Sequence, residues 1–147
     1  MKKTLAIASD HAGYTLKLSV IQYLKDKGYQ VKDFGTDTGE AVDYPDYGHP
    51  LAEAVESGEA HLGISLCGSG NGINMVTNKH QGIRGALCWN REISALARSH
   101  NDANICSIPA RFVDLKTTLE IVDAFLQTEF EGGRHIKRIQ KIPIAKP

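Results

Sequence analysis

The sequence predicts an α/β protein: a Rossmann-like, doubly wound sheet of five parallel strands with helices on both faces. Two alternating apolar patterns predict it. Short apolar runs typical of buried strands alternate with longer stretches whose apolar residues recur at helical spacing. Such alternation builds βαβ units and a parallel sheet covered on both sides. The chain has 147 residues and no repeat, linker or low-complexity segment, so we expect a single domain over 1–147.

The elements follow from local signals in chain order. Expected strands cover residues 4–9, 29–35, 61–67, 82–89 and 103–110, and the third is so apolar that it should be central. Expected helices cover residues 14–28, 51–58, 73–80, 90–100, 113–130 and 133–141. Asn90 is a candidate N-cap, Asp114 lies near a helix start, and a Gly-Gly pair precedes the last helix. Residues 36–50 are dense in Gly, Asp and Pro and predict a loop.

The position of the two least ordinary stretches depends on strand order. With the common order 2-1-3-4-5, the first and third strands are neighbours, and ligands bind beyond their carboxyl ends. Asp10 and His11 follow the first strand, and residues 67–72 end the third. We therefore expect these stretches to face each other at the switch point.

Composition excludes several classes of protein. Seventeen basic and seventeen acidic residues give zero net charge, which argues against a nucleic-acid partner. The apolar run at the start is too short for a signal peptide, and no stretch could span a membrane. Three irregularly spaced cysteines show no metal or disulfide pattern. We expect a cytoplasmic protein with reduced thiols and no metal site.

The glycine-rich stretch 67–72 does not match a nucleotide motif. Gly68, Gly70 and Gly72 alternate, whereas a dinucleotide fingerprint would need glycine at Ile73, and the Gly-Lys-Ser/Thr of a phosphate loop is absent. Alternating glycines allow successive N–H groups to converge on an anion, and the following helix adds its positive end. Three glycines exceed what a strand-to-helix turn requires, so we favour an anion-binding site.

Cys67 is the candidate reactive group of this loop. A cysteine in an apolar strand is usually a core residue, but Cys67 lies at the carboxyl end, where backbone N–H groups favour a thiolate. Cys88 and Cys106 lie within apolar strands and are expected in the core. His100 and Asn101 end a helix, which by itself predicts only a cap. With Cys67 they suggest either a Cys/His hydrolase or acid–base chemistry on a sugar.

Basic residues near the C-terminus offer a phosphate site. Arg134 and Arg138 lie four residues apart on one helical face, and Arg111 follows the fifth strand. Such residues usually form a solvated surface, but two arginines on one face can bind a phosphate dianion. Tyr44 lies in a turn-like stretch and could form a wall of the site.

Several stretches together resemble the ribose-5-phosphate isomerase B family, within the wider group that includes the heteromeric galactose-6-phosphate isomerase. The resemblance spans nearly the whole chain. It rests on the order and spacing of "SDHAG" at 9–13, "DYPDY" at 43–47, "CGSGNGI" at 67–73, "NK" at 78–79 with "GIR" at 82–84, "HNDAN" at 100–104, "AR" at 110–111 and "EGGRHIKRI" at 131–139.

The resemblance implies an aldose–ketose isomerase that interconverts ribose 5-phosphate and ribulose 5-phosphate through a cis-enediolate, without cofactor. It implies that Cys67 moves the proton between C2 and C1 and that His100, with Asp10 and Ser69, opens the sugar ring. The implied ligands of the enediolate are Gly68, Ser69, Gly70, Asn71 and Gly72, those of the phosphate are His11, Arg111, Arg134 and Arg138, and those of the sugar are Tyr44 and Asn101.

In another branch of the family the base is a Glu just after "SGNG". Here that position is Ile73, which cannot accept a proton, so the resemblance assigns the base to Cys67. It also implies a homodimer, or a tetramer, with sites shared between subunits. A six-carbon sugar phosphate as substrate stays open, as do a Cys/His hydrolase and a non-catalytic sugar-phosphate sensor.

Overall fold

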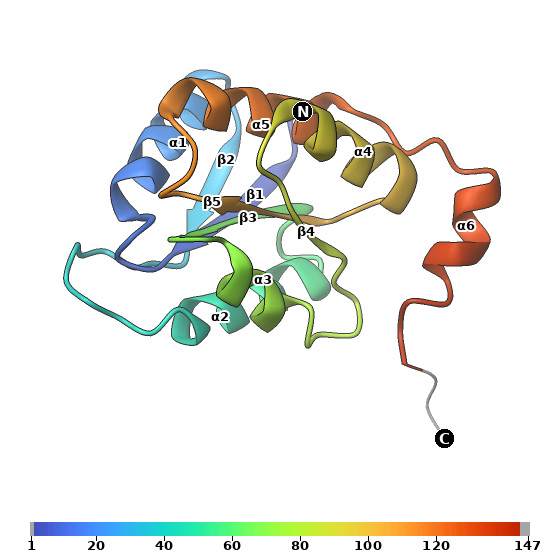
Figure 1. Ribbon diagram of the computed structural model, residues 1–147, viewed down its shortest axis with the longest axis horizontal. Coiled ribbons are helices and arrows are strands. Elements are labelled where there is room, and N and C mark those ends of the chain that lie inside the picture. Colours follow the sequence, from blue (N-terminus) through green and yellow to red (C-terminus); the bar gives the residue numbers. More distant parts are fainter. Residues whose placement is uncertain (1, 145–147) are drawn as a thin grey trace.

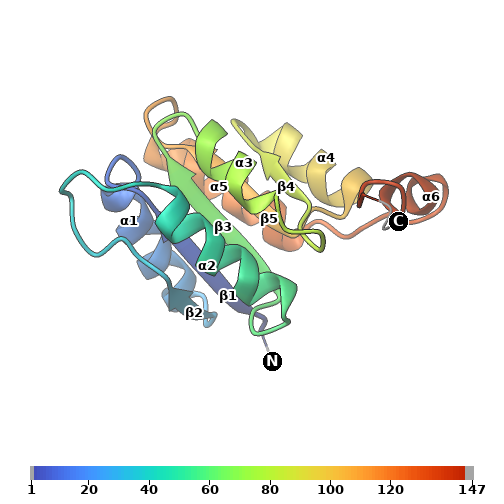
Figure 2. The ribbon, with the colours of Figure 1, turned by 90° about the horizontal axis from the view of Figure 1, so that it is seen from below.

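The predicted architecture is confirmed. The computed structural model describes residues 2–144, so Met1 and residues 145–147 of the expected domain lie outside the described part. All five strands are parallel, and helices cover both faces of the sheet (Figures 1 and 2). The strands are β1 (Thr4–Ser9), β2 (Gln30–Asp33), β3 (Leu62–Cys67), β4 (Gly85–Leu87) and β5 (Ile105–Pro109). The helices are α1 (Tyr14–Asp26), α2 (Pro45–Glu56), α3 (Asn71–Thr77), α4 (Arg91–Asn101), α5 (Leu115–Gln127) and α6 (Arg134–Ile139).

The predicted order of the last two strands is wrong. The observed order is β2-β1-β3-β5-β4, so β5 lies between β3 and the edge strand β4. Connections between parallel strands are right-handed, so the face that a helix covers shows in which direction the chain moves across the sheet. α4 packs on the same face as α1, so the chain turns back after β4 as it does after β1. Burial agrees, because β5 is fully buried while the three residues of β4 are only partly buried.

Two apolar layers hold the helices against the sheet. On one face, strand residues such as Ile7, Ile64 and Ile108 pack with Val20 of α1 and Phe125 of α5. On the other face, α2 packs on small strand residues, which allow its close approach. Full burial of each large aliphatic side chain contributes about 1.5–3 kcal/mol to folding. Figure 1 shows α1, α4 and α5 on one side of the sheet, α2 and α3 on the other, and α6 beyond the end of α4.

Most helix boundaries lie within a few residues of those predicted, with one clear exception. α2 begins at Pro45, inside the stretch predicted as a loop. Proline is favoured in the first turn of a helix. Pro45 therefore begins a helix in a stretch whose Gly, Asp and Pro content predicted a loop. The predicted caps are confirmed: the side chains of Asn90 and Asp114 accept the N–H groups of Ile93 and Thr117 at 2.9 and 2.7 Å.

The last predicted helix, 133–141, is shorter in the structure and covers Arg134–Ile139. Gly132 and Gly133 before it both have positive φ, at 68° and 56°, which explains the break that their sequence predicted. None of the helices within residues 2–144 combines the length and the apolar character that a membrane crossing would require.

Candidate active site

The glycine loop lies at the carboxyl edge of the sheet, where β3 ends at Cys67. The Cys67 residue is only 4% exposed. Gly70 has φ 76°, and a Cβ added there would lie 2.6 Å from Cδ1 of Leu87, so this turn requires glycine. Among the described residues, none accepts a hydrogen bond from the backbone N–H of Gly68, Ser69 or Gly70. Free donors beside a thiol are what an anion-binding loop requires, and anion binding here stays a prediction.

Asp10 and His11 lie next to this loop, because β1 and β3 are neighbouring strands, as expected. The Asp10 N–H donates to the carbonyl of Leu66 at 3.2 Å, immediately before Cys67. The Asp10 carboxylate is buried and accepts the N–H of Gly13 at 3.1 Å. Nδ1 of His11 accepts the N–H of Val42 at 3.1 Å, which orients the imidazole. The structure therefore brings both residues to the switch point.

Arg111 and the ring of Tyr44 border the same loop. The N–H groups of Ala110 and Arg111 donate to the carbonyls of Cys67 and Gly68 at 2.9 and 3.0 Å, because β5 is the direct neighbour of β3. The corrected strand order thus places Arg111 at the loop. A Cβ added to Gly72 would lie 2.5 Å from Cζ of Tyr44, so the phenol ring packs directly on that glycine. Asn71, which is exposed, begins α3 behind the loop.

Ser69 is an exposed member of the loop. Its Oγ accepts the N–H of Asn71 at 3.3 Å, so the hydroxyl hydrogen is available to another acceptor. The predicted residues at this edge therefore supply a buried thiol, a carboxylate, a hydroxyl and backbone donors. This set can remove a proton and stabilise the anion that results.

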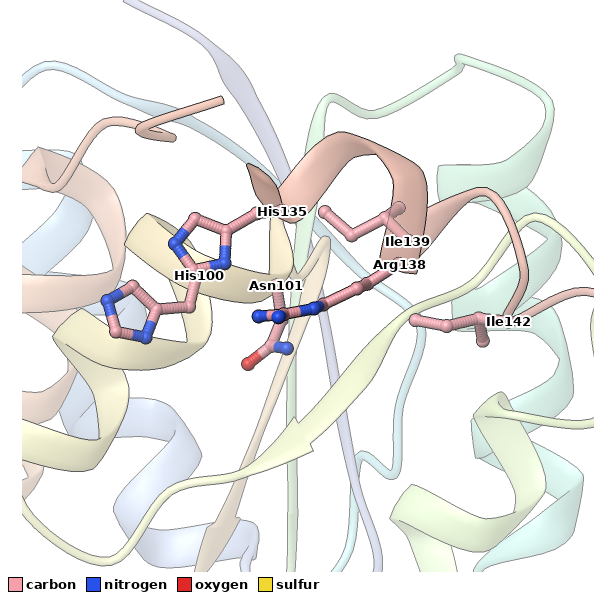
Figure 3. Close-up of a pocket in the computed structure, with 6 residues that line it drawn as sticks. All are labelled: His100, Asn101, His135, Arg138, Ile139 and Ile142. Carbon is pink, nitrogen blue, oxygen red and sulfur yellow. The ribbon is translucent and has the colours of Figure 1, made fainter. Parts of the chain in front are cut away.

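The remaining predicted residues form a second cluster, at the ends of α4 and α6. His100, Asn101 and Arg138 line a cavity of about 370 Å³ together with His135, Ile139 and Ile142 (Figure 3). Arg134 begins α6, four residues before Arg138. Among residues 2–144, neither arginine forms a salt bridge, so both guanidinium groups are available to an anion.

Asp102 fixes the end of α4 that carries His100 and Asn101. It adopts a left-handed conformation with φ 46°. Its carboxylate accepts hydrogen bonds from Arg98 at 2.9 Å and from Arg84 at 3.4 Å. Arg98 is almost fully buried, and it also bonds to the carbonyl of Ala103. These bonds tie the helix end to the body of the protein and limit the movement of the His100 backbone.

The two clusters lie at opposite edges of the sheet. The carbonyl of Asn104, just after the second cluster, accepts the N–H of Gly63 at the start of β3 at 2.8 Å. Cys67 ends the same strand four residues later, about 13 Å away at the rise of a parallel strand. One chain therefore does not bring Cys67 and His100 together, and a Cys/His dyad of the hydrolase type is not formed within it.

Sequence reasoning overlooked two residues of the second cluster, Glu131 and His135. The rings of His100 and His135 are stacked, with centroids 4.4 Å apart, and Nε2 of His100 lies 3.6 Å from Oε2 of Glu131. Burial lowers the pKa of His135 below its ordinary value, and the neighbouring charge of Arg134 lowers it further. The only sequence signal for Glu131 and His135 is their four-residue spacing, which places two residues on one face of a continuous helix. The Gly-Gly pair between them predicts a break in the helix, so the spacing gave no indication that they lie together.

The other cysteines are core residues, as predicted. Cys88 and Cys106 are fully buried, and all three cysteines are free thiols. A hydrogen bond with Cys88, together with burial, raises the pKa of Cys106 well above that of an ordinary thiol. The same hydrogen bond lowers the pKa of Cys88, but both side chains are sealed from solvent. Cys67, at the carboxyl end of β3, is therefore the reactive candidate.

Comparisons with known proteins agree with the motifs. The Ribose/Galactose Isomerase family matches residues 5–142. A probable ribose-5-phosphate isomerase B of Mycoplasma pneumoniae is 46% identical over 143 residues, which cover 97% of this chain and 94% of that protein. The structure of ribose-5-phosphate isomerase B from Clostridium thermocellum superposes with a TM-score of 0.94 at 50% identity, covering 95% of this chain and 94% of that one.

A further solved structure, from Mycoplasma genitalium, is ribose-5-phosphate isomerase B with bound ribulose-5-phosphate. It has a TM-score of 0.92 and 42% identity, and the match covers 95% of this chain and 93% of that one. Family, sequence and fold agree over almost the full length, and they confirm the resemblance that the motifs predicted. This chain therefore belongs to the Ribose/Galactose Isomerase family.

Proposed function

We propose that this protein is an aldose–ketose isomerase that interconverts D-ribose 5-phosphate and D-ribulose 5-phosphate through a cis-enediolate, without a metal. The observation that carries the proposal is a buried thiol at the start of a loop in which the N–H groups of Gly68, Ser69 and Gly70 have no acceptor among the described residues. A relative with the same fold binds ribulose-5-phosphate, which supports the choice of a five-carbon sugar. Interconversion of these two pentose phosphates is a step of pentose phosphate metabolism.

Proton transfer is assigned to Cys67. In the aldose-to-ketose direction the thiolate accepts the proton from C2, and the electron pair of that C–H bond forms the enediolate. The proton returns to C1, while the hydroxyl proton of O2 shifts to O1, so that no atom is gained or lost. A proton next to a carbonyl is too weakly acidic for a side chain to remove unaided. Each preorganised N–H donor to the enediolate oxygen contributes about 3–4 kcal/mol to lowering that barrier.

Ring opening precedes this step, because ribose 5-phosphate is mainly a furanose. We assign it to His100, whose imidazole can donate and accept a proton, with Asp10 and Ser69 at the opposite side of the ring. Arg134 and Arg138 supply charge-assisted hydrogen bonds to the phosphate, and Tyr44 and Asn101 contact the sugar. His11 and Arg111, at the carboxyl edge, complete the proposed phosphate contacts.

The opposite placement of the two clusters supports a shared active site. We infer a homodimer in which the cluster around His100 in one subunit completes the loop of Cys67 in the other; a tetramer would be two such pairs. The three free cysteines favour a cytoplasmic location, where thiols stay reduced.

An assay on five- and six-carbon aldose phosphates, with a chelator present, tests the reaction. We expect conversion of ribose 5-phosphate to ribulose 5-phosphate, with uptake of solvent hydrogen at C1, and no hydrolysis of an activated ester. Conversion of allose or galactose 6-phosphate instead would reassign the substrate. Binding of ribose 5-phosphate without conversion would leave only the sensor function.

Mixed oligomers test the shared site. Cys67→Ala and His100→Gln subunits alone are each expected to have about 1% of the wild-type activity or less. Unfolded together and refolded, or coexpressed, they form mixed dimers in which one of two sites has both wild-type residues. Random pairing then restores about a quarter of the wild-type activity. No recovery in verified mixed dimers would show that each site is built from one chain.

A further inference from the structure

A cluster of two histidines and a glutamate joins the end of α4 to α6. One potential ligand atom from each of His100, Glu131 and His135 lies within 4.8 Å of the other two. The Glu131 N–H donates to the carbonyl of Ser99 at 3.0 Å, so its backbone is fastened beside the last turn of α4. The proposed reaction uses only one of these three side chains. The other two therefore require another explanation.

We propose that His100, Glu131 and His135 form a binding site for a divalent transition-metal ion, with Zn²⁺ the ion that best fits this donor set. Two imidazoles and one carboxylate are a common zinc-binding combination, and they leave a fourth position open to water or to a phosphate oxygen. The inference rests on the proposed function for its consequence, which is inhibition: a metal bound to His100 occupies the group assigned to ring opening.

His135 supplies an independent observation. Its side chain belongs to a residue only 6% exposed, and Nε2 is buried without a hydrogen-bond partner among the described residues. Buried polar nitrogens are nearly always paired with protein or water, so an unpaired one calls for a partner. A metal bound at this imidazole, with its waters, would supply such a partner.

The distances require only small side-chain movements. Zinc–ligand bonds of about 2.0–2.2 Å in a tetrahedron place ligand atoms about 3.4 Å apart. The 3.6 Å between Nε2 of His100 and Oε2 of Glu131 is already close to that value. The side chains of His100 and Glu131 are 38% and 53% exposed, so they can adjust toward the buried His135. The stacked imidazoles must splay so that one nitrogen of each points to the ion.

The charges around the cluster set its behaviour. Arg134 and Arg138 lie on the same short helix as His135 and oppose a bound cation, while Glu131 favours it. We therefore expect weak binding that a chelator readily reverses. In Figure 3 the imidazoles of His100 and His135 lie side by side, and Asn101 and Arg138 project beside them. A phosphate held by Arg138 would supply the negative charge that the cluster lacks.

Zinc titration by calorimetry, on the chelator-treated full-length protein, tests binding without reference to activity. We expect one Zn²⁺ per chain, with the affinity reduced about tenfold or more in His135→Gln and in the exposed variant Glu131→Gln. His49→Ala is the matched control, because His49 and His80 form another close imidazole pair, 2.8 Å apart, outside this cluster. Undiminished binding in His135→Gln and Glu131→Gln, or absence of binding in the wild type, would overturn the site.

Activity measurements then test the consequence. Zn²⁺ should inhibit conversion of ribose 5-phosphate, a chelator should restore it, and Glu131→Gln should require about tenfold more Zn²⁺ for the same fractional inhibition. Each variant is compared with its own metal-free rate. Zinc binding that leaves the wild-type rate unchanged would contradict the inhibitory role. An inactive protein that still binds zinc through Glu131 and His135 would reject the proposed function and retain the metal site.

Discussion

The two edges of the sheet carry chemistry of different kinds. At the carboxyl edge, a loop of backbone N–H groups follows a buried thiol, and its glycines set the geometry. At the amino edge, long and largely exposed side chains extend from the ends of α4 and α6. Ligands of open α/β sheets usually bind only at the carboxyl edge. We therefore propose that the functional side chains at the two edges are two half-sites, each completed by the other half from a second copy of the chain.

The difference also separates the steps of the reaction. Donors that must stabilise an anion at a fixed point are best built from backbone, which has little freedom to move. Groups that bind a phosphate or pass a proton to a ring oxygen tolerate more movement and can stand on long side chains. We therefore expect substitutions of Cys67 and its glycine loop to affect proton transfer, and substitutions of His100, Arg134 and Arg138 at the amino edge to affect ring opening and phosphate binding.

The largest effect is expected from Cys67→Ala. Without its general base the enzyme should lose turnover by about 10⁴-fold, together with exchange of the substrate hydrogen with solvent. Hydrogen exchange by NMR, in deuterated water, measures the step directly. Cys106→Ala removes a core thiol within β5 and is the control for general loss of structure. Normal hydrogen exchange in Cys67→Ala would show that another residue is the general base.

A smaller and more selective effect is expected from His100→Gln. Turnover of ribose 5-phosphate should fall about 10²-fold, since spontaneous ring opening still supplies some open-chain sugar. Ribulose 5-phosphate has its phosphate on O5 and stays open-chain, so its hydrogen exchange should be almost unaffected. The ratio of ribose 5-phosphate turnover to ribulose 5-phosphate hydrogen exchange, measured on one preparation, tests whether His100 acts in ring opening. Equal losses in both would place His100 in proton transfer itself.

Much of the carboxyl edge could be predicted from sequence because its signals are local. The alternating glycines, the apolar strand before Cys67 and the pair Asp10–His11 each identify a position at the end of a strand. The opposite position of His100 could have been predicted from the same alternation, because a helix between parallel strands ends at the amino edge. The resemblance to an isomerase, which joins all these residues in one site, concealed that separation.

Other features depend on packing that no short stretch encodes. The exchange of β4 and β5 follows from the face on which α4 packs, and only that exchange brings Arg111 beside Gly68. The loop predicted over 36–50 contains the start of α2, because proline has opposite effects at the start and in the interior of a helix. The contact of His100 with His135 joins residues on two helices separated by β5 and α5.

At the amino edge, Arg134→Ala should raise KM for ribose 5-phosphate by about 10–100-fold with a smaller change in kcat. A charge-assisted hydrogen bond contributes about 1.5–3 kcal/mol, and each 1.4 kcal/mol is a factor of ten in binding. Lys137→Ala, which removes another exposed cation of α6, is the matched control for overall charge. If both variants raise KM equally, the arginine acts through the general field of the helix and not through a direct contact.

The two ends of α4 should respond differently to substitution. Asn90→Ala removes the cap at the carboxyl-edge end and should cost about 1 kcal/mol of stability, or about 3 °C in Tm. Because Asp102 fixes the other end through Arg98 and Arg84, kcat should change little. Thermal unfolding and steady-state kinetics measure both. A large loss of kcat at temperatures where the variant is folded would show that the cap also positions His100.

The smallest effect concerns Asp114, which caps α5 at the carboxyl edge as Asn90 caps α4. The hydrogen bond from the Thr117 N–H lowers the pKa of the Asp114 carboxyl below its ordinary value of 3.8. Below that value the unfolded chain takes up a proton more readily than the folded one. The stabilisation is therefore complete at pH values above the ordinary pKa and is lost as pH falls through the lower pKa of the folded state.

Asp114→Asn keeps a capping oxygen but lacks the charge, so the Tm of the wild type should exceed that of the variant at neutral pH and approach it in acid. The neutral Asn90 cap has no such dependence, so the Tm deficit of Asn90→Ala should persist in acid. A difference between wild type and Asp114→Asn that stays constant with pH would show that the charge of this cap is without effect on stability.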